Sequence, residues 1–296
     1  MPNSGILLID KPTDMTSHDL VNIARKIFKT KKIGHNGTLD PDATGVMVLC
    51  IGQATRLNEY LSADNKRYRA TLIFGNETDT QDISGKVTAT CSLPELTEVE
   101  FCDILSGFIG VQEQTPPLYS AIKKNGKPLY QYAREGDVIP DIPKRTIEVY
   151  SIRCISFDNS KAVIDIHCSK GTYIRTLCQD IARACGSCGC MSELRRTAAG
   201  EFSLEQCIEI ETLRQSQDPY TLLMPMSTAL SFPKIYIETD ALRTDLMNGK
   251  RLKLSQCHVD TLDVKSEWFQ AIYQDDLLSI GKIEDGCFVP KKVFCG

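Results

Sequence analysis

The most informative segment of the chain is GHNGTLDPDATGVMVLCI, residues 34–51. Its first part is rich in Gly, Asp and Thr, which predicts a loop, and residues 46–51 form an apolar run typical of a buried strand. Asp40 precedes Pro41, whose ring disfavours helical geometry for the residue before it. We therefore expect Asp40 at the mouth of the core, partly desolvated, where a carboxylate can act as a nucleophile or base. From the residues alone, an Asp in such a segment is more often a structural residue, because Asp-Pro is a common turn.

On both sides of this segment the chain alternates between strand and helix patterns without a regular β-α-β order. Strands are expected at residues 6–9, 68–74, 147–155 and 162–167. Helices are expected at residues 17–28, capped by Thr16 or Ser17, and at residues 173–185. This mixture predicts an α+β fold, with a mixed, largely antiparallel sheet and flanking helices.

Two regions depart from this pattern. Residues 114–146 contain five prolines around a short helical stretch at residues 129–134, and a long excursion of this kind is usually a functional loop. The composition changes near residues 224–233, beyond which short strand-like runs are broken by glycines. We therefore expect a larger domain at residues 1–230, with an insertion at about 114–146, and a small β-rich domain at residues 231–296.

Composition and charge restrict the possible function classes. The formal net charge of −4 argues against indiscriminate coating of nucleic acid, although local basic clusters can still bind RNA. No signal peptide or membrane-spanning run is visible, so we expect a cytoplasmic location and no membrane. In that compartment the thirteen cysteines should be free thiols. We interpret Cys185, Cys188 and Cys190 as small residues at a helix end and predict no metal, because no second ligand pair completes a zinc site.

Seven segments, in sequence order, resemble the motifs of the TruB family of tRNA pseudouridine synthases. The loop at residues 34–45 resembles the family's GHTGTLDPLATG-like loop, which carries its one obligatory aspartate. The other segments are LLIDKP (7–12) with TSHD (16–19), KRY (66–68), TDTQD (78–82) with Gly85, QTPPLYSA (114–121) with Lys123 and Gly126, KGTYIRT (170–176) and LRRT (194–197). The likeness spans roughly residues 5–230.

The resemblance implies a catalytic role for three residues. Asp40 would attack the target nucleotide, or abstract a proton from its ribose, so that uracil leaves, rotates and reattaches through carbon. Arg175 would pair with Asp40 and keep it ionised. Tyr68 would stack on the flipped uracil, and its hydroxyl would take part in proton transfer at C5. Lys11 and Asp82 would belong to the supporting structure around them.

The resemblance also implies how the substrate is held. His35 would wedge into the T loop, and Tyr173 and Leu194 would complete the base pocket. Lys123, in the insertion, and the pair Arg195-Arg196 would contact the RNA backbone. The expected substrate is uridine 55 in the T stem-loop of tRNA, with no cofactor and no obligatory protein partner, and the small C-terminal domain would be PUA-like and bind RNA.

The chain departs from the family pattern at three points. Asn36 replaces the usual threonine, Asp42 replaces a commonly apolar residue, and Met47-Val48 replaces a Leu-Pro pair. These changes can alter loop packing or target fit, but none removes a proposed catalytic group.

Two other functions stay open at this point. The first is an RNA chaperone that folds tRNA through the same contacts. The second is a phosphohydrolase in which Asp40, Asp79 and Asp82 hold Mg²⁺, because carboxylate oxygens are preferred ligands of that ion. The absence of long basic tails favours a standalone enzyme over the guide-RNA-dependent branch of the superfamily.

Overall fold

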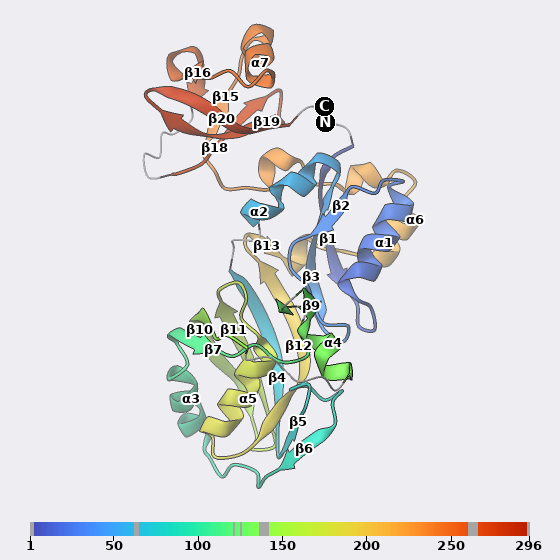
Figure 1. Ribbon diagram of the computed structural model, residues 1–296, viewed down its shortest axis with the longest axis vertical. Coiled ribbons are helices and arrows are strands. Elements are labelled where there is room, and N and C mark those ends of the chain that lie inside the picture. Colours follow the sequence, from blue (N-terminus) through green and yellow to red (C-terminus); the bar gives the residue numbers. More distant parts are fainter. Residues whose placement is uncertain are drawn as a thin grey trace.

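The computed structural model describes residues 3–61, 65–120, 122–124, 126–135, 142–259 and 266–294. Parts of the predicted insertion, namely Ala121, Asn125 and residues 136–141, lie outside these ranges. Figure 1 shows an elongated molecule with a large sheet in its lower part and a second, smaller sheet at the upper end.

The large sheet has ten strands and is mostly antiparallel. Its order is β14 (Ile208–Glu209), β1 (Gly5–Lys11), β3 (Thr44–Ile51), β12 (Gly189–Ala199), β4 (Lys66–Phe74), β11 (Lys161–Cys168), β10 (Arg145–Phe157) and β7 (Gly110–Gln114), with β13 (Phe202–Ser203) beside β12 and β2 (Ile33–His35) beside β3. Only the pairs β1–β14 and β3–β12 are parallel within it. The predicted α+β architecture and its largely antiparallel sheet are confirmed.

Helices cover one face of this sheet, where their apolar sides meet the strands in one continuous core. They are α1 (Ser17–Ile27), α3 (Glu98–Ser106), α5 (Ile174–Ala184) and α6 (Ile210–Gln215). Thr16 caps α1 in a capping box with Asp19, as its sequence position predicts. We did not predict α3, although Thr97 and Glu100 form the same kind of box at its start. We also did not predict β12, which runs through the centre of the sheet.

The opposite face of β1 and β3 packs against the C-terminal part of the chain. This part forms a six-stranded sheet in the order β16 (Leu252–Lys253), β20 (Cys287–Val293), β19 (Asp276–Glu284), β18 (Phe269–Tyr273), β15 (Lys234–Tyr236) and β17 (His258–Val259), with helix α7 (Asp240–Met247). Ile6 and Val48 share a buried cluster with Leu277 and Phe294. The C-terminal region is therefore β-rich, as predicted, and it shares a core with the large sheet.

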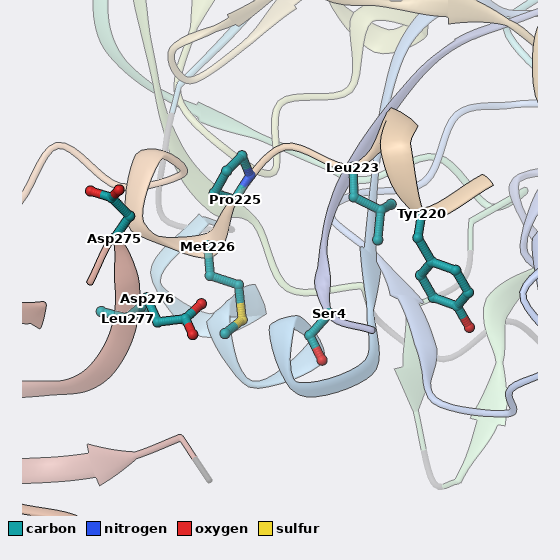
Figure 2. Close-up of a pocket in the computed structure, with 8 residues that line it drawn as sticks. All are labelled: Ser4, Tyr220, Leu223, Pro225, Met226, Asp275, Asp276 and Leu277. Carbon is teal, nitrogen blue, oxygen red and sulfur yellow. The ribbon is translucent and has the colours of Figure 1, made fainter. Parts of the chain in front are cut away.

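A cavity of about 210 Å³ lies at this junction (Figure 2). Its lining residues come from the N-terminus, from the segment before β15, and from the β18–β19 turn: Ser4, Tyr220, Leu223, Pro225, Met226, Asp275, Asp276 and Leu277. None of them is a predicted site residue. The cavity therefore belongs to the junction of the two sheets and not to the chemistry proposed for Asp40.

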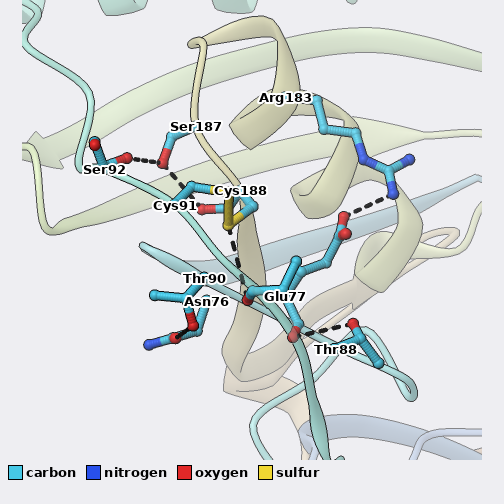
Figure 3. The surroundings of a disulfide bond; sticks show 10 residues. Asn76, Glu77, Thr88, Thr90, Cys91, Ser92, Arg183, Ser187 and Cys188 are labelled. Carbon is cyan, nitrogen blue, oxygen red and sulfur yellow. Dashed lines mark hydrogen bonds and ion pairs between the residues drawn. A yellow bond between two sulfur atoms is a disulfide. The ribbon is translucent and has the colours of Figure 1, made fainter.

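The cysteines depart from the expectation of free thiols at one place. Cys91, just after β6 (Val87–Thr90), forms a disulfide with Cys188, just before β12 (Figure 3). The strand β6 pairs with β5 (Asn76–Thr78) in a two-stranded ribbon, so the bond ties this ribbon to the large sheet. Cys185 does cap α5, but Cys190 lies within β12, so the interpretation of the cluster as a helix end is wrong for Cys188 and Cys190.

The described residues contain neither a group of His, Cys, Asp and Glu side chains arranged to hold a metal ion nor a helix long and apolar enough to span a bilayer. The predicted insertion contains a small ribbon of β8 (Lys123–Lys124) and β9 (Lys127–Pro128), followed by α4 (Leu129–Glu135).

Candidate active site

The loop that carries Asp40 connects β2 to β3 and is fixed at several points along its length. Leu39 is buried, and its backbone amide donates to the Ser17 hydroxyl at 2.9 Å. The Ala43 amide donates to the Asp40 carbonyl at 3.1 Å, which closes a turn around Pro41. Gly45 has a φ of +106°, and a Cβ there would lie 2.2 Å from the carbonyl oxygen of Arg196. Only glycine satisfies both conditions, so the end of the loop lies directly against β12.

Lys11 supports this loop from beneath. Its side chain is fully buried, and Nζ donates to the carbonyl oxygens of Pro12, Met15 and Pro41 at 2.9, 2.5 and 2.8 Å. Burial lowers the pKa of Lys11 to about 8, although three nearby aspartates oppose that shift. Because Pro41 directly follows Asp40, the Lys11 ammonium fixes the backbone next to the carboxylate.

Arg175, in the first turn of α5, forms the predicted ion pair with Asp40. Nε lies 3.0 Å from Oδ2, and Nη2 donates to Oδ1 at 3.3 Å, so both carboxylate oxygens are engaged. The Arg175 side chain is 7% exposed, whereas that of Asp40 is 38% exposed. A two-point contact of this kind fixes the orientation of the carboxylate as well as its charge.

The same guanidinium joins two further segments to the site. Nη1 donates to the Thr80 carbonyl at 3.0 Å and lies 3.5 Å from Asp82 Oδ2, and Nη2 donates to the Tyr119 carbonyl at 3.0 Å. Arg175 therefore occupies the space between Asp40 and Asp82 in which a shared Mg²⁺ would have to bind. This geometry argues against the phosphohydrolase interpretation.

The Asp40 carboxyl has an unusual environment for an ion-paired acid. Burial raises its pKa, and the like charges of Asp82 and Asp42 act in the same direction. Arg175 provides the largest opposing influence, followed by Lys11. The ionised form of Asp40 therefore depends on Arg175, and its loss would favour the neutral acid.

Tyr68 and Leu194 lie on the strands that flank this site. Tyr68 is half-buried on β4, near enough to Asp40 that this charge contributes to raising the pKa of the phenol, although burial is the larger cause. Leu194 is buried on β12 opposite Ala70 of β4. Tyr173 is the N-terminal cap residue of α5, and its backbone exchanges two hydrogen bonds with the Gln114 side chain.

The three predicted RNA contacts His35, Lys123 and Arg195 lie on three different strands, β2, β8 and β12. His35 ends β2 beside the loop, and burial lowers the pKa of its imidazole. Lys123 is exposed on the small ribbon of the insertion. Arg195 lies on β12 and is engaged by Asp10 at 2.6 Å and by the Thr44 hydroxyl at 3.1 Å.

Arg196 corrects the prediction of an exposed Arg195-Arg196 pair. Its side chain is 1% exposed and lies inside the molecule against the loop that carries Asp40. Residues alternate between the two faces of a strand, so only one of two neighbouring arginines can point outward. Arg196 therefore cannot contact an RNA backbone.

Two family models match adjoining parts of the chain, which together span residues 25–231. The TruB family pseudouridylate synthase N-terminal domain matches residues 25–174, and the tRNA pseudouridylate synthase B C-terminal domain matches residues 175–231. The curated tRNA pseudouridine synthase B of Alkaliphilus oremlandii is 44% identical over 88% of this chain and 86% of its own length. That of Caldanaerobacter subterraneus subsp. tengcongensis is 37% identical over 99% of this chain and 100% of its own. The chain belongs to the TruB family.

This TruB family member is thus a pseudouridine synthase, and the enzyme class predicted from its motifs is confirmed. Among solved structures it is similar to a chain of a Cbf5-Nop10-Gar1 complex, with a TM-score of 0.74 and 25% identity, covering 99% of this chain and 86% of that one. The border between the two TruB family models falls directly before Arg175, so each model contributes one member of the ion pair.

Proposed function

We propose that this TruB family enzyme converts uridine 55 in the T arm of tRNA into pseudouridine, with Asp40 as the essential carboxylate and without a cofactor. The observation that carries the proposal is the two-point pair between Asp40 and the buried Arg175, in a chain whose relatives are named tRNA pseudouridine synthase B.

The reaction is an isomerisation with few chemical requirements. The bond between N1 of uracil and C1′ of ribose breaks, the base rotates, and a bond between C5 and C1′ forms. C5 loses one proton and N1 gains one, so nothing is oxidised and no group is exchanged. A carboxylate in one fixed orientation suits this task, either as the group that attacks the nucleotide or as the base that removes a ribose proton.

The surroundings of Asp40 support binding of a base that has left its stack. Tyr68 offers an aromatic ring, and Leu194 and Tyr173 complete the walls of the proposed pocket. Unstacking a base costs a few kcal/mol, which stacking on aromatic side chains and contacts to the RNA backbone offset. Arg175, held in turn by backbone carbonyls, keeps the carboxylate charged in this partly dry place.

The remaining contacts to tRNA are proposed at the periphery. His35 would wedge into the T loop, and Lys123 and Arg195 would contact phosphates. Because Arg195 already forms an ion pair with Asp10, we expect it to contribute less to phosphate binding than Lys123. We further propose that residues 1–230 are the catalytic domain, that residues 231–296 are a PUA-like RNA-binding domain, and that the enzyme works in the cytoplasm without an obligatory protein partner.

The test is to incubate an unmodified tRNA transcript with the wild type, Asp40→Asn and Asp42→Asn, and then to map pseudouridine. We expect modification at uridine 55 by the wild type and by Asp42→Asn, because Asp42 is an exposed neighbour without a contact to Arg175. Asp40→Asn should form no product while it still binds tRNA. Tight binding by the wild type without product would favour the chaperone, and product lost on adding a chelator to folded tRNA would favour a metal-dependent enzyme.

A further inference from the structure

Arg196 is a buried cation without a carboxylate partner. It is the largest of the fully buried side chains in the described residues. Whereas Arg195 pairs with Asp10, no Asp or Glu in the described ranges lies within ion-pair distance of the Arg196 guanidinium. An uncompensated buried charge costs several kcal/mol. A neutral side chain at position 196 would avoid this free-energy cost of burial, so the presence of a charge there needs a reason.

Loop fixation explains only part of what Arg196 does. Nε donates to the Val46 carbonyl at 2.7 Å, and Nη2 lies 3.4 Å from the Gly37 carbonyl and 3.3 Å from the Met47 sulfur. These contacts join both ends of the loop that carries Asp40. However, a neutral amide could donate to a carbonyl equally well, so these contacts do not require a guanidinium.

The Arg196 charge acts on a side chain of the adjacent strand β4. Arg196 on β12 lies directly opposite Tyr68 on β4, and directly opposed residues project from the same face of a sheet. The positive charge of Arg196 lowers the pKa of Tyr68, against the larger effect of burial. The other groups that act on this phenol, Cys168 from β11 and Asp40 from the loop, both raise its pKa.

We propose that Arg196 is a positioning residue for the reaction, one that holds the Tyr68 hydroxyl in place and supplies the positive charge that lets its oxygen accept the proton leaving C5. The proposal rests on the proposed function for its chemical step. In that step Tyr68 acts as the phenolate, its own proton having passed to solvent. The C5–H bond breaks after the C5–C1′ bond has formed, its electron pair restores the ring, and the proton goes to the phenolate oxygen, which restores the phenol. N1 gains its proton from solvent, so no further reactant is needed.

The first test measures the phenol directly and needs no RNA. Tyrosine is labelled at Cζ, the Tyr68 resonance is assigned with Tyr68→Phe, and its pKa is measured by NMR in the wild type and in Arg196→Gln. We expect the pKa of Tyr68 to rise by at least about one unit when the charge is removed. Arg69→Gln is the matched control, because Arg69 adjoins Tyr68 on β4 but pairs with Asp165, and it should cause no shift. An unchanged pKa of Tyr68 in Arg196→Gln would overturn the proposal.

The second test separates action through Tyr68 from a purely structural role. Single-turnover rates are measured for Arg196→Gln, Tyr68→Phe and the double variant. If Arg196 acts through Tyr68, the two losses overlap and the double variant is about as slow as Tyr68→Phe; losses that multiply would refute the idea. If Arg196→Gln does not fold, Arg196→Lys is used in its place, because it keeps the charge. A fall in its single-turnover rate of more than about a hundredfold would contradict the proposal. If the wild type makes no pseudouridine, the proposed function fails, while the NMR titration still decides whether Arg196 controls Tyr68.

Discussion

Replacing Lys11 by methionine should produce a loss of stability that grows with pH. The fully buried Lys11 ammonium has a pKa of about 8 instead of 10.5, and its unfolded counterpart titrates at the ordinary value. Between these two values the unfolded chain binds a proton that the folded chain does not. The wild type therefore becomes more stable as pH rises through this window, by about 3 kcal/mol in total. Lys11→Met lacks this contribution.

At neutral pH two effects of Lys11→Met oppose each other. The variant no longer buries a charge, but three carbonyl oxygens, including that of Pro41, lose their donor, at about 1–3 kcal/mol each. We expect a net loss of about 1–3 kcal/mol near pH 7, rising by about 3 kcal/mol toward pH 10.5. The product-forming rate should fall at least about tenfold, because the backbone after Asp40 is less firmly held.

The assay is urea unfolding of both proteins at a series of pH values, analysed as the difference in unfolding free energy, so that other titrating groups cancel. Lys26→Met, at an exposed position on α1, is the control and should cost less than about 0.5 kcal/mol. A difference between wild type and Lys11→Met that stays constant from pH 7 to 10.5 would refute the assignment of a desolvated ammonium beneath the catalytic loop.

Three further outcomes are expected. Arg175→Lys retains a charge but not the two-point contact to Asp40, so single-turnover product formation should fall at least about a hundredfold while filter binding detects unchanged tRNA affinity. Gly45→Ala should destabilise the protein by more than about 2 kcal/mol in urea, because its φ of +106° and the Arg196 backbone leave no place for a Cβ. Cys91→Ser should lower the unfolding free energy by about 2–4 kcal/mol without reductant and by nothing in its presence, where the wild type has lost the same bond.

Local patterns predicted several of the strands and helices around the site. The period-2 and period-3.6 spacings placed β1, β3, β4, β10, β11, α1 and α5 within a few residues of their observed bounds. They failed for β12, since its sequence, with Ser192, Glu193 and two arginines, does not alternate cleanly, and bulges interrupt its pairing with β4. They also missed α3, although the capping box at Thr97 was a readable signal.

Sequence patterns were enough to place Asp40 on a glycine-rich loop before a buried strand, because loop composition and apolar runs are local properties. Contacts between distant segments came only from the folded chain: Arg175 reaches Asp40 across 135 residues of chain, and Cys91 reaches Cys188 across 97. It also decided that Arg195 points outward and Arg196 inward. Strand pairing fixes that choice, since a shift of one residue in register would exchange the two faces, and no local pattern in LRRT specifies the register.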